Sequence, residues 1–182
     1  AFTGDGILQV EKGDKLTCTY IDHLGDFGIE EAVTDIAFYR ITLKSGTLST
    51  SQTWAKADSP YLITGDVTVN ENKTLTIEAG SVVYVSVNDD QSGGDDENRS
   101  ELIIRGSLVA EGTETDSIVF ISSSETPQPG DWYGIRVTTN SSDDYWAVSS
   151  ATLKYCRIEH NVNGIYAKGD IGRDNVDTYF IR

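Results

Sequence analysis

Residues 75–82, Leu-Thr-Ile-Glu-Ala-Gly-Ser-Val, resemble residues 102–108, Leu-Ile-Ile-Arg-Gly-Ser-Leu. Each stretch contains a short apolar strand, a Gly-Ser turn and the start of a second strand. The two lie 27 residues apart, or slightly fewer once the acidic insertion between them is discounted. A repeat of this length indicates a solenoid, because one unit cannot bury its apolar face alone and stacks on its neighbours. About three strands fit into each repeat, so the pattern predicts a β-helix.

The rest of the chain has the same strand chemistry. Apolar residues fall in short runs rich in Val, Ile, Thr and Tyr, and Gly, Asn, Asp and Ser separate these runs. Helix signals are almost absent, so we expect an all-β protein. Strands near residues 6–10, 16–22 and 32–43 resemble the closing strands of immunoglobulin-like repeats in microbial surface proteins. We therefore expect an immunoglobulin-like β-strand segment over residues 1–46 and a parallel β-helix domain over residues 47–182.

A succession of motifs after residue 47 carries a second resemblance. It includes Gly65-Asp-Val-Thr-Val69, Gly106-Ser-Leu-Val-Ala-Glu-Gly-Thr113 and Gly130-Asp-Trp-Tyr-Gly-Ile135. This order is similar to the right-handed parallel β-helix segments of bacterial and archaeal extracellular proteins. The resemblance implies a short β-helix of about three to four coils, with Gly80, Gly106 and Gly134 at its corners. The side chains expected to stack as its core are Val69, Leu75, Ile77, Val83, Leu102, Ile104, Leu108, Ile118, Phe120, Ile135, Cys156, Ile158 and Ile165.

Charge and composition exclude some classes of partner. The chain has 182 residues, with 14 Lys and Arg against 29 Asp and Glu, which gives a formal net charge of −15. Nucleic acids are held mainly by Lys and Arg, so we expect no nucleic-acid partner. No apolar run is long enough for membrane insertion. Three glycosylation sequons at Asn72, Asn98 and Asn140 fit an extracellular or cell-surface location.

The insertion at residues 88–98 places five carboxylates on one glycine-containing loop. Calcium prefers six to eight oxygen ligands, and glycines allow a loop to wrap an ion. The sequence therefore gives a candidate Ca²⁺ site, although the spacing departs from that of an EF-hand. The alternative is a solvated acidic loop without a metal. The candidate ligands are Asp89, Asp90, Asp95, Asp96 and Glu97.

The two cysteines, Cys18 and Cys156, match no metal-binding spacing. They form either one long-range disulfide or two buried thiols, and the sequence leaves both alternatives open.

Three aromatic residues, Trp132, Tyr133 and Trp146, are candidates for a sugar-stacking platform or for interface anchors. Packing in the core is the simpler role for them. Catalysis on a β-helix needs clustered carboxylates beside a basic residue, or paired acids across a cleft. The nearest candidates are Asp131 with Arg136 and Glu159 with Arg157, and we interpret both pairs as solvated surface. We predict no catalytic residues.

These features favour a non-enzymatic extracellular structural protein. A partial sandwich at one end and a solenoid without a clear stop at the other would expose strand edges, which proteins avoid unless something pairs with them. We therefore expect a subunit that assembles with itself into a surface fibre, filament or layer by β-strand addition, with calcium as a candidate bridge. The alternative is a glycan-binding or adhesive module of a larger surface protein that binds a polysaccharide. A polysaccharide lyase is the third and weakest hypothesis.

Overall fold

The computed structural model describes residues 41–87, 93–138 and 149–168, together with the backbone of three strands outside these ranges. These three strands are β1 (Tyr20–Ile21), β2 (Phe27–Gly28) and β15 (Val176–Ile181). The chain divides into two compact units, Ala1–Tyr39 and Arg40–Arg182. In the first unit β1 pairs with β2 in the antiparallel direction. The other residues of that unit lie outside the described part, so the immunoglobulin-like segment stays a prediction.

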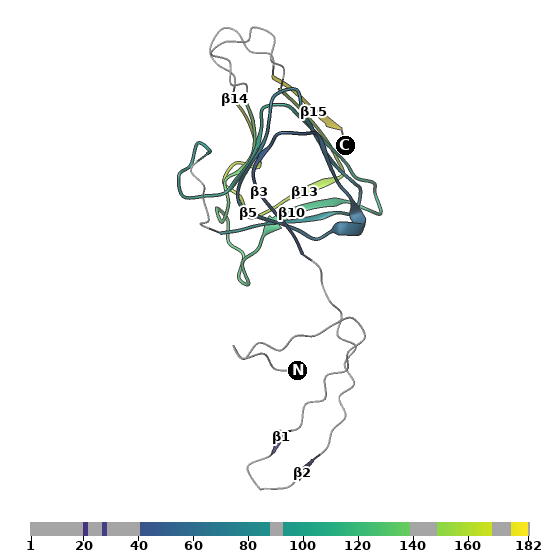
Figure 1. Ribbon diagram of the computed structural model, residues 1–182, viewed down its shortest axis with the longest axis vertical. Coiled ribbons are helices and arrows are strands. Elements are labelled where there is room, and N and C mark those ends of the chain that lie inside the picture. Colours follow the sequence, from purple (N-terminus) through teal and green to yellow (C-terminus); the bar gives the residue numbers. More distant parts are fainter. Residues whose placement is uncertain are drawn as a thin grey trace. The chain divides into compact units, whose positions relative to one another are not determined.

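The second unit is a right-handed parallel β-helix, and its coils have a triangular outline in Figure 1. Face A is formed by the ends of β3 (Thr42–Leu48) and β5 (Tyr61–Val69), then β8 (Glu101–Ile104), β11 (Gly134–Thr138) and β14 (Ile165–Lys168). Face B is formed by β4 (Gln52–Trp54), β6 (Thr74–Ile77), β9 (Ser107–Glu111), β12 (Ser149–Lys154) and β15. Face C is formed by the starts of β3 and β5, then β7 (Val82–Val85), β10 (Ile118–Ser122) and β13 (Cys156–Ile158).

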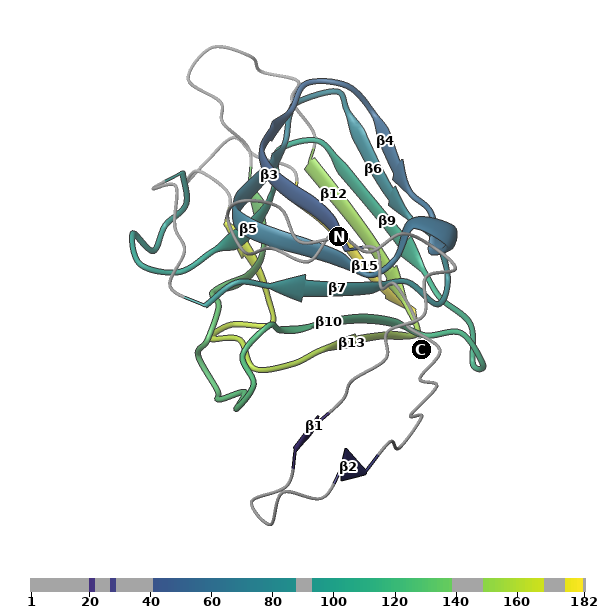
Figure 2. The same ribbon diagram turned by 60° about the horizontal axis from the view of Figure 1, so that its bottom comes forward.

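Every described strand pair in this unit is parallel, and Figure 2 shows the strands of face B lying side by side. The all-β class and the parallel β-helix are thus confirmed. β3 spans the boundary expected at residue 46 and pairs with β5, and β15 pairs with β12.

Helical structure in the described part of the chain is limited to one 3₁₀ turn, η1 (Lys56–Asp58). No helix among the described residues has the length and apolar character needed to cross a membrane.

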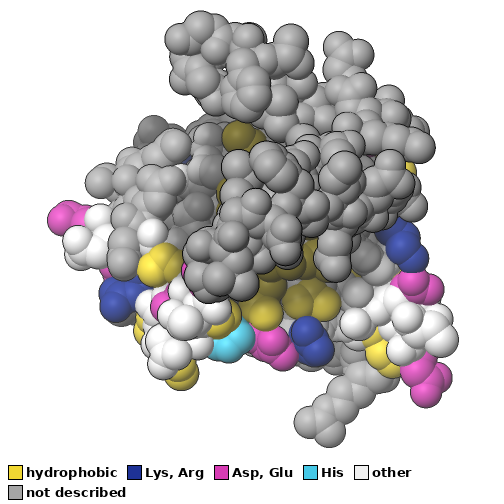
Figure 3. Space-filling view, turned by 90° about the horizontal axis from the view of Figure 1, so that it is seen from below, with side chains coloured by type: hydrophobic (Ala, Val, Ile, Leu, Met, Phe, Trp, Pro, Cys, Tyr) yellow, Lys and Arg dark blue, Asp and Glu magenta, His cyan; other side chains and the backbone are white. Residues whose placement is uncertain are grey.

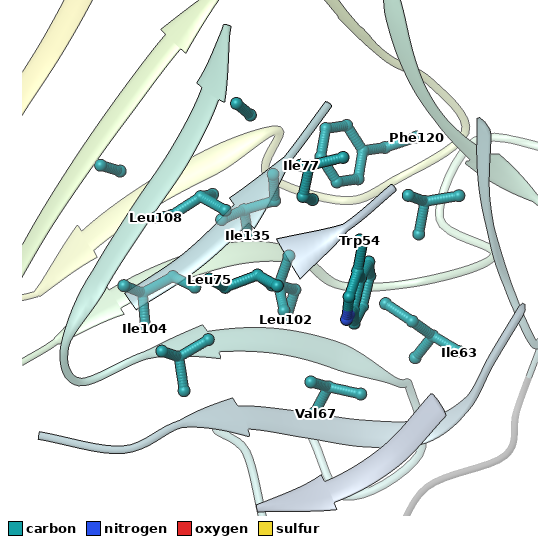
Figure 4. Packing of buried hydrophobic residues seen from close by; sticks show 14 of the residues in the cluster. Trp54, Ile63, Val67, Leu75, Ile77, Leu102, Ile104, Leu108, Phe120 and Ile135 are labelled. Carbon is teal, nitrogen blue, oxygen red and sulfur yellow. The ribbon is translucent and has the colours of Figure 1, made fainter. Parts of the chain in front are cut away.

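The core consists of side chains that stack directly on one another from coil to coil. On face A, Val67 aligns with Leu102, Leu102 with Ile135, and Ile135 with Ile165. Figure 4 shows several of these side chains packed between the three faces. All thirteen residues predicted for the core lie in this cluster, and Cys156, Ile158 and Ile165 are its partly buried members. The short apolar runs therefore identified these inward positions, but they missed others such as Trp54, Tyr61 and Ile63.

Glycine is required at two corners. Gly106 separates β8 from β9, and a Cβ atom there would lie 2.2 Å from the Lys73 carbonyl oxygen of the preceding coil. Gly80 separates β6 from β7 and has a φ of +78°, which side chains rarely adopt. The predicted corner role of both glycines is confirmed.

The repeat spacing inferred from the sequence is wrong. The two similar stretches do not occupy equivalent positions, because Leu75 lies in β6 of face B and Leu102 lies in β8 of face A. The residue that stacks on Leu75 is Leu108, 33 residues further along the chain. The local similarity is misleading because two different corners of the triangle share one sequence pattern, a strand followed by a Gly-Ser turn and a second strand.

Adjacent substitutions in β9 test the inward register. Leu108 is fully buried, so Leu108→Ala should lower the free energy of unfolding by about 2–5 kcal/mol through lost burial and a residual cavity. Val109 faces outward and is half-buried, so Val109→Ala should cost less than about 1 kcal/mol. Urea unfolding of both variants measures the difference. Equal losses of unfolding free energy in the two variants would contradict the inward register.

Candidate functional site

Charged side chains gather on the outer surface of face A. Asp66 of β5, Glu101 of β8 and Arg136 of β11 alternate along their strands with the inward residues of the core. Parallel pairing sets Val67 opposite Leu102 and Arg136 opposite Ile103, so the three charged residues lie close together on neighbouring coils. All three are buried, and Glu101 has no exposed surface.

Glu101 is held by hydrogen bonds to both of its carboxylate oxygens. Its Oε1 accepts from the backbone N–H groups of Asp95 (2.7 Å) and Asp96 (2.9 Å). Its Oε2 accepts from Nε of Arg136 at 2.8 Å. The Arg136 guanidinium also reaches Oδ1 of Asp95 at 3.1 Å. The carboxylate therefore joins the sheet to the loop that precedes β8.

Asp66 makes the same kind of connection one coil earlier. Its Oδ2 accepts from the backbone N–H of Gly93 at 2.7 Å, and its Oδ1 accepts from the N–H of Glu101 at 2.8 Å. Gly94 lies so close to the sheet that a Cβ atom would be 2.3 Å from Oε1 of Glu101. The described part of the loop, residues 93–99, thus lies directly on the charged side chains.

This arrangement supports the fold and leaves little room for chemistry. A general base must come within hydrogen-bond reach of a substrate proton. Both oxygens of Glu101 are already occupied, and the side chain has no contact with solvent. Buried charges are tolerated when they are paired and hydrogen-bonded, as they are here. We call Asp66, Glu101 and Arg136 the buried charge cluster.

Removing one member of this cluster should destabilise the protein. Glu101→Gln removes the charge that pairs with Arg136, and we expect a loss of about 3 kcal/mol in unfolding free energy because the guanidinium stays buried. Glu159→Gln is the matched control, since Glu159 forms an exposed pair with Arg157 and should cost no more than about 1 kcal/mol. Denaturant titration of the two variants makes the comparison. If the two variants lose similar amounts of unfolding free energy, the cluster does not hold the loop.

The predicted calcium ligands lie in the loop, but two of their carboxylates face arginines. Asp95 pairs with Arg136, and Oδ2 of Asp96 lies 2.8 Å from NH1 of Arg99. Glu97 is exposed, and Asp89 and Asp90 lie outside the described residues. Within the described ranges, no three His, Cys, Asp or Glu side chains are grouped to hold a metal ion. The calcium site therefore stays a prediction.

The acid–base pairs considered from the sequence are arranged differently in the structure. Oδ2 of Asp131 accepts from Oγ of Ser122 (2.6 Å) and from the N–H of Gln128 (3.0 Å), and Arg136 pairs with Glu101 and Asp95 instead. Glu159 does pair with Arg157, at 3.3 Å on the surface. The cluster was not predicted from the sequence. Asp66 and Glu101 are 35 residues apart, as are Glu101 and Arg136, and the three meet only when their strands pair in the correct register. The signal was present: each charge lies next to an inward apolar residue, Val67, Leu102 or Ile135.

Trp132 belongs to the core. Its side chain has no exposed surface, and its Nε1 donates to the Glu159 carbonyl oxygen at 2.8 Å. It therefore has no face to offer a sugar. Tyr133 is half-buried, and Trp146 lies outside the described residues.

The described glycosylation sequons lie on the surface. Asn72 and Asn98 are both exposed residues in turns. Asn140 lies outside the described residues.

Cys156 is a free thiol in the structure. It is half-buried, and its Sγ lies 3.2 Å from the Ala110 carbonyl oxygen. Burial raises the pKa of this thiol to about 11. Cys18 lies outside the described residues, so its pairing with Cys156 stays a prediction.

The raised pKa predicts slow thiol chemistry. At pH 8 only about 0.1% of Cys156 would be thiolate, against about a quarter of an ordinary cysteine. A Cys18→Ser variant should therefore react with a disulfide reagent at least about ten-fold more slowly when folded than when unfolded in denaturant, because the small thiolate fraction outweighs the higher nucleophilicity of that thiolate. Fast reaction of the folded variant would contradict the burial. The absence of any thiol in the unfolded wild-type chain would establish the disulfide.

Comparison with known proteins gives one match. A family model described as a pectate-lyase-like beta helix domain matches residues 46–155. This range begins within β3 and ends directly after β12. No curated protein and no solved structure matches the chain.

Proposed function

The chain belongs to the pectate-lyase-like β-helix domain family, and we propose that it is a non-enzymatic structural module of an extracellular or cell-surface assembly. In this proposal the module associates with further copies of itself by β-strand addition. The family includes enzymes, so the proposal depends on what the charged residues of this chain do.

The closed state of the buried charge cluster is the observation that carries the proposal. A lyase or hydrolase on this fold would need carboxylates and a basic group that a polysaccharide can reach. Asp66, Glu101 and Arg136 have the right chemistry and lie on one solenoid face. The loop at residues 93–99 covers them, and its backbone occupies their hydrogen-bonding positions. They are therefore used to fix the loop.

The exposed pair of Arg157 and Glu159 supports the same conclusion. Its Nε–Oε1 distance is 3.3 Å, so each group already has its partner. Glycosidases use two carboxyl groups on either side of the scissile bond, and this pair supplies one.

Strand edges support self-association. In the described part of the chain, β4 pairs on one side with β6, and β15 pairs on one side with β12. Among the described residues no strand pairs with the second side of β4 or β15, so both sides are candidate templates for strand addition.

In the first coil, the charged side chain of Lys44 lies between the apolar core and water. Nζ of Lys44 lies 5.4 Å from the ring centre of Trp54 and 5.7 Å from that of Tyr61, and it hydrogen-bonds Oε1 of Gln52 at 3.4 Å. The two rings are stacked with their centres 5.0 Å apart. Because Lys44 covers the apolar rings here, a contact at this end would use the backbone edges of β3 and β4.

Calcium and glycan binding take no part in the proposed assembly. The carboxylates of Asp95 and Asp96 face Arg136 and Arg99, so a cation would have to displace these partners. The burial of Trp132 removes one aromatic residue on which a glycan-binding module would depend.

Negative-stain electron microscopy of the purified chain tests the proposal. We expect regular filaments or sheets, and we expect them to persist after calcium chelation. Dispersed monomers under both conditions would overturn the proposal, and loss on chelation would restore a calcium bridge. In parallel, incubation with acidic polysaccharides should give no unsaturated products. Cleavage by the wild-type chain would show that it is an enzyme after all.

A further inference from the structure

The outer surfaces of the three faces differ in character. Face B carries side chains suited to water, and its outward positions are mostly Thr and Ser. They are Thr53, Thr74, Thr76, Ser107, Val109, Ser150 and Thr152. The outward charges of face A are covered by the loop at residues 93–99. These two faces are therefore mostly polar or covered, with Tyr166 of β14 as an exposed aromatic side chain on face A.

Face C is the exception, because its outward positions are apolar on four neighbouring strands. Figure 3 views this side of the molecule and shows hydrophobic side chains gathered together, with charged groups beside them. Leu43 is 63% exposed and Tyr84 36% exposed, and the others are half-buried by their neighbours. The apolar patch consists of Leu43, Leu62, Val82, Tyr84, Val119 and Ile121.

Strand register orders these residues in two rows. Leu43 aligns with Leu62, Leu62 with Tyr84, and Tyr84 with Ile121. The second row starts at Val82 and continues through Val119 to Arg157. Exposed apolar patches of this kind mark interaction sites.

Arg157 and Glu159, which pair with each other within one copy, end the two rows with opposite charges. They lie two residues apart at β13, with side chains 61% and 38% exposed. A twofold axis parallel to the stack of coils would reverse strand direction and keep the order of the coils. It would place Val82 of one copy against Tyr84 of the other, Val119 against Ile121, and Arg157 against Glu159. A twofold axis along the strands would instead place these charges against the apolar end of the patch.

We propose that the outer surface of face C is a homotypic lateral interface, in which two copies pair about a twofold axis parallel to their coils. The inference rests on the proposed self-assembly and names a second contact for it. Strand addition extends an assembly along the coil axis, and pairing through face C joins two such rows side by side. Both contacts keep the coil axes parallel, so they are compatible in one fibre or layer.

The size of the patch predicts a weak pair. With strands about 4.8 Å apart, it measures roughly 20 Å along the stack and covers a few hundred Å². A stable interface buries about 800 Å² on each partner. We therefore expect a weak dimer in solution, and the linked contacts of an array would reinforce it.

Charge reversal at β13 tests the axis directly. Arg157→Glu and Glu159→Arg should each bring like charges together across the interface and weaken dimerisation at least about ten-fold in sedimentation equilibrium. The double variant that combines both changes restores opposite charges and should recover the wild-type dissociation constant. Failure of the double variant to recover would overturn the proposed axis, and circular dichroism of each variant checks the fold.

A second pair of variants tests the apolar patch itself. Tyr84→Glu places a charge within it, and Thr76→Glu is the matched control on face B of the same unit. In electron micrographs, Tyr84→Glu should convert paired or sheet-like assemblies into single rows, whereas Thr76→Glu should leave them unchanged. Assemblies unaltered by Tyr84→Glu would overturn the lateral interface and leave strand addition standing. Absence of any wild-type association would overturn both.

Discussion

Direct stacking of inward side chains from one coil to the next is the constraint on which the structure depends. Each coil has to place an inward side chain directly against the aligned inward side chain of the preceding coil, as Val67, Leu102 and Ile135 do. Because side chains alternate along a strand, a shift of one residue would turn the whole inward set toward water. The corners have to keep this register while the intervening loops differ in length. The glycine requirement at Gly106 follows, since its backbone passes too close to Lys73 for any side chain.

The same alternation explains what could be predicted from the sequence. Inward residues are apolar over short runs, so the β-helix and its core could be identified without knowing which strands are neighbours. The number of residues per coil could not be predicted. The corners use similar residues, so one local match does not reveal which corner it represents. Leu75 and Leu102 look equivalent in the sequence, yet they lie on different faces.

The buried charge cluster shows why the candidate site was harder to predict. Asp66, Glu101 and Arg136 look like ordinary solvent-facing residues of a strand. They are buried because the loop before β8 folds back over them, and the path of a loop is not encoded in the period of the strands. A loop rich in acidic residues indicated a metal site from composition alone. The structure shows backbone N–H groups of that loop donating to carboxylates of the sheet, and the metal site stays a prediction.

Lys44 has a consequence for how a protein of this kind lengthens over evolutionary time. Solenoids grow by duplication of coils, and a new coil placed ahead of β3 would cover the inward side of the first coil. The ammonium group that now lies over Trp54 and Tyr61 would then be enclosed in the core without water. Insertion on that side would need a simultaneous replacement of Lys44 by an apolar residue. Duplication between inner coils needs no such change, because their inward positions are already apolar. Lys44 thus makes the first coil a fixed boundary and leaves the interior of the stack free to expand.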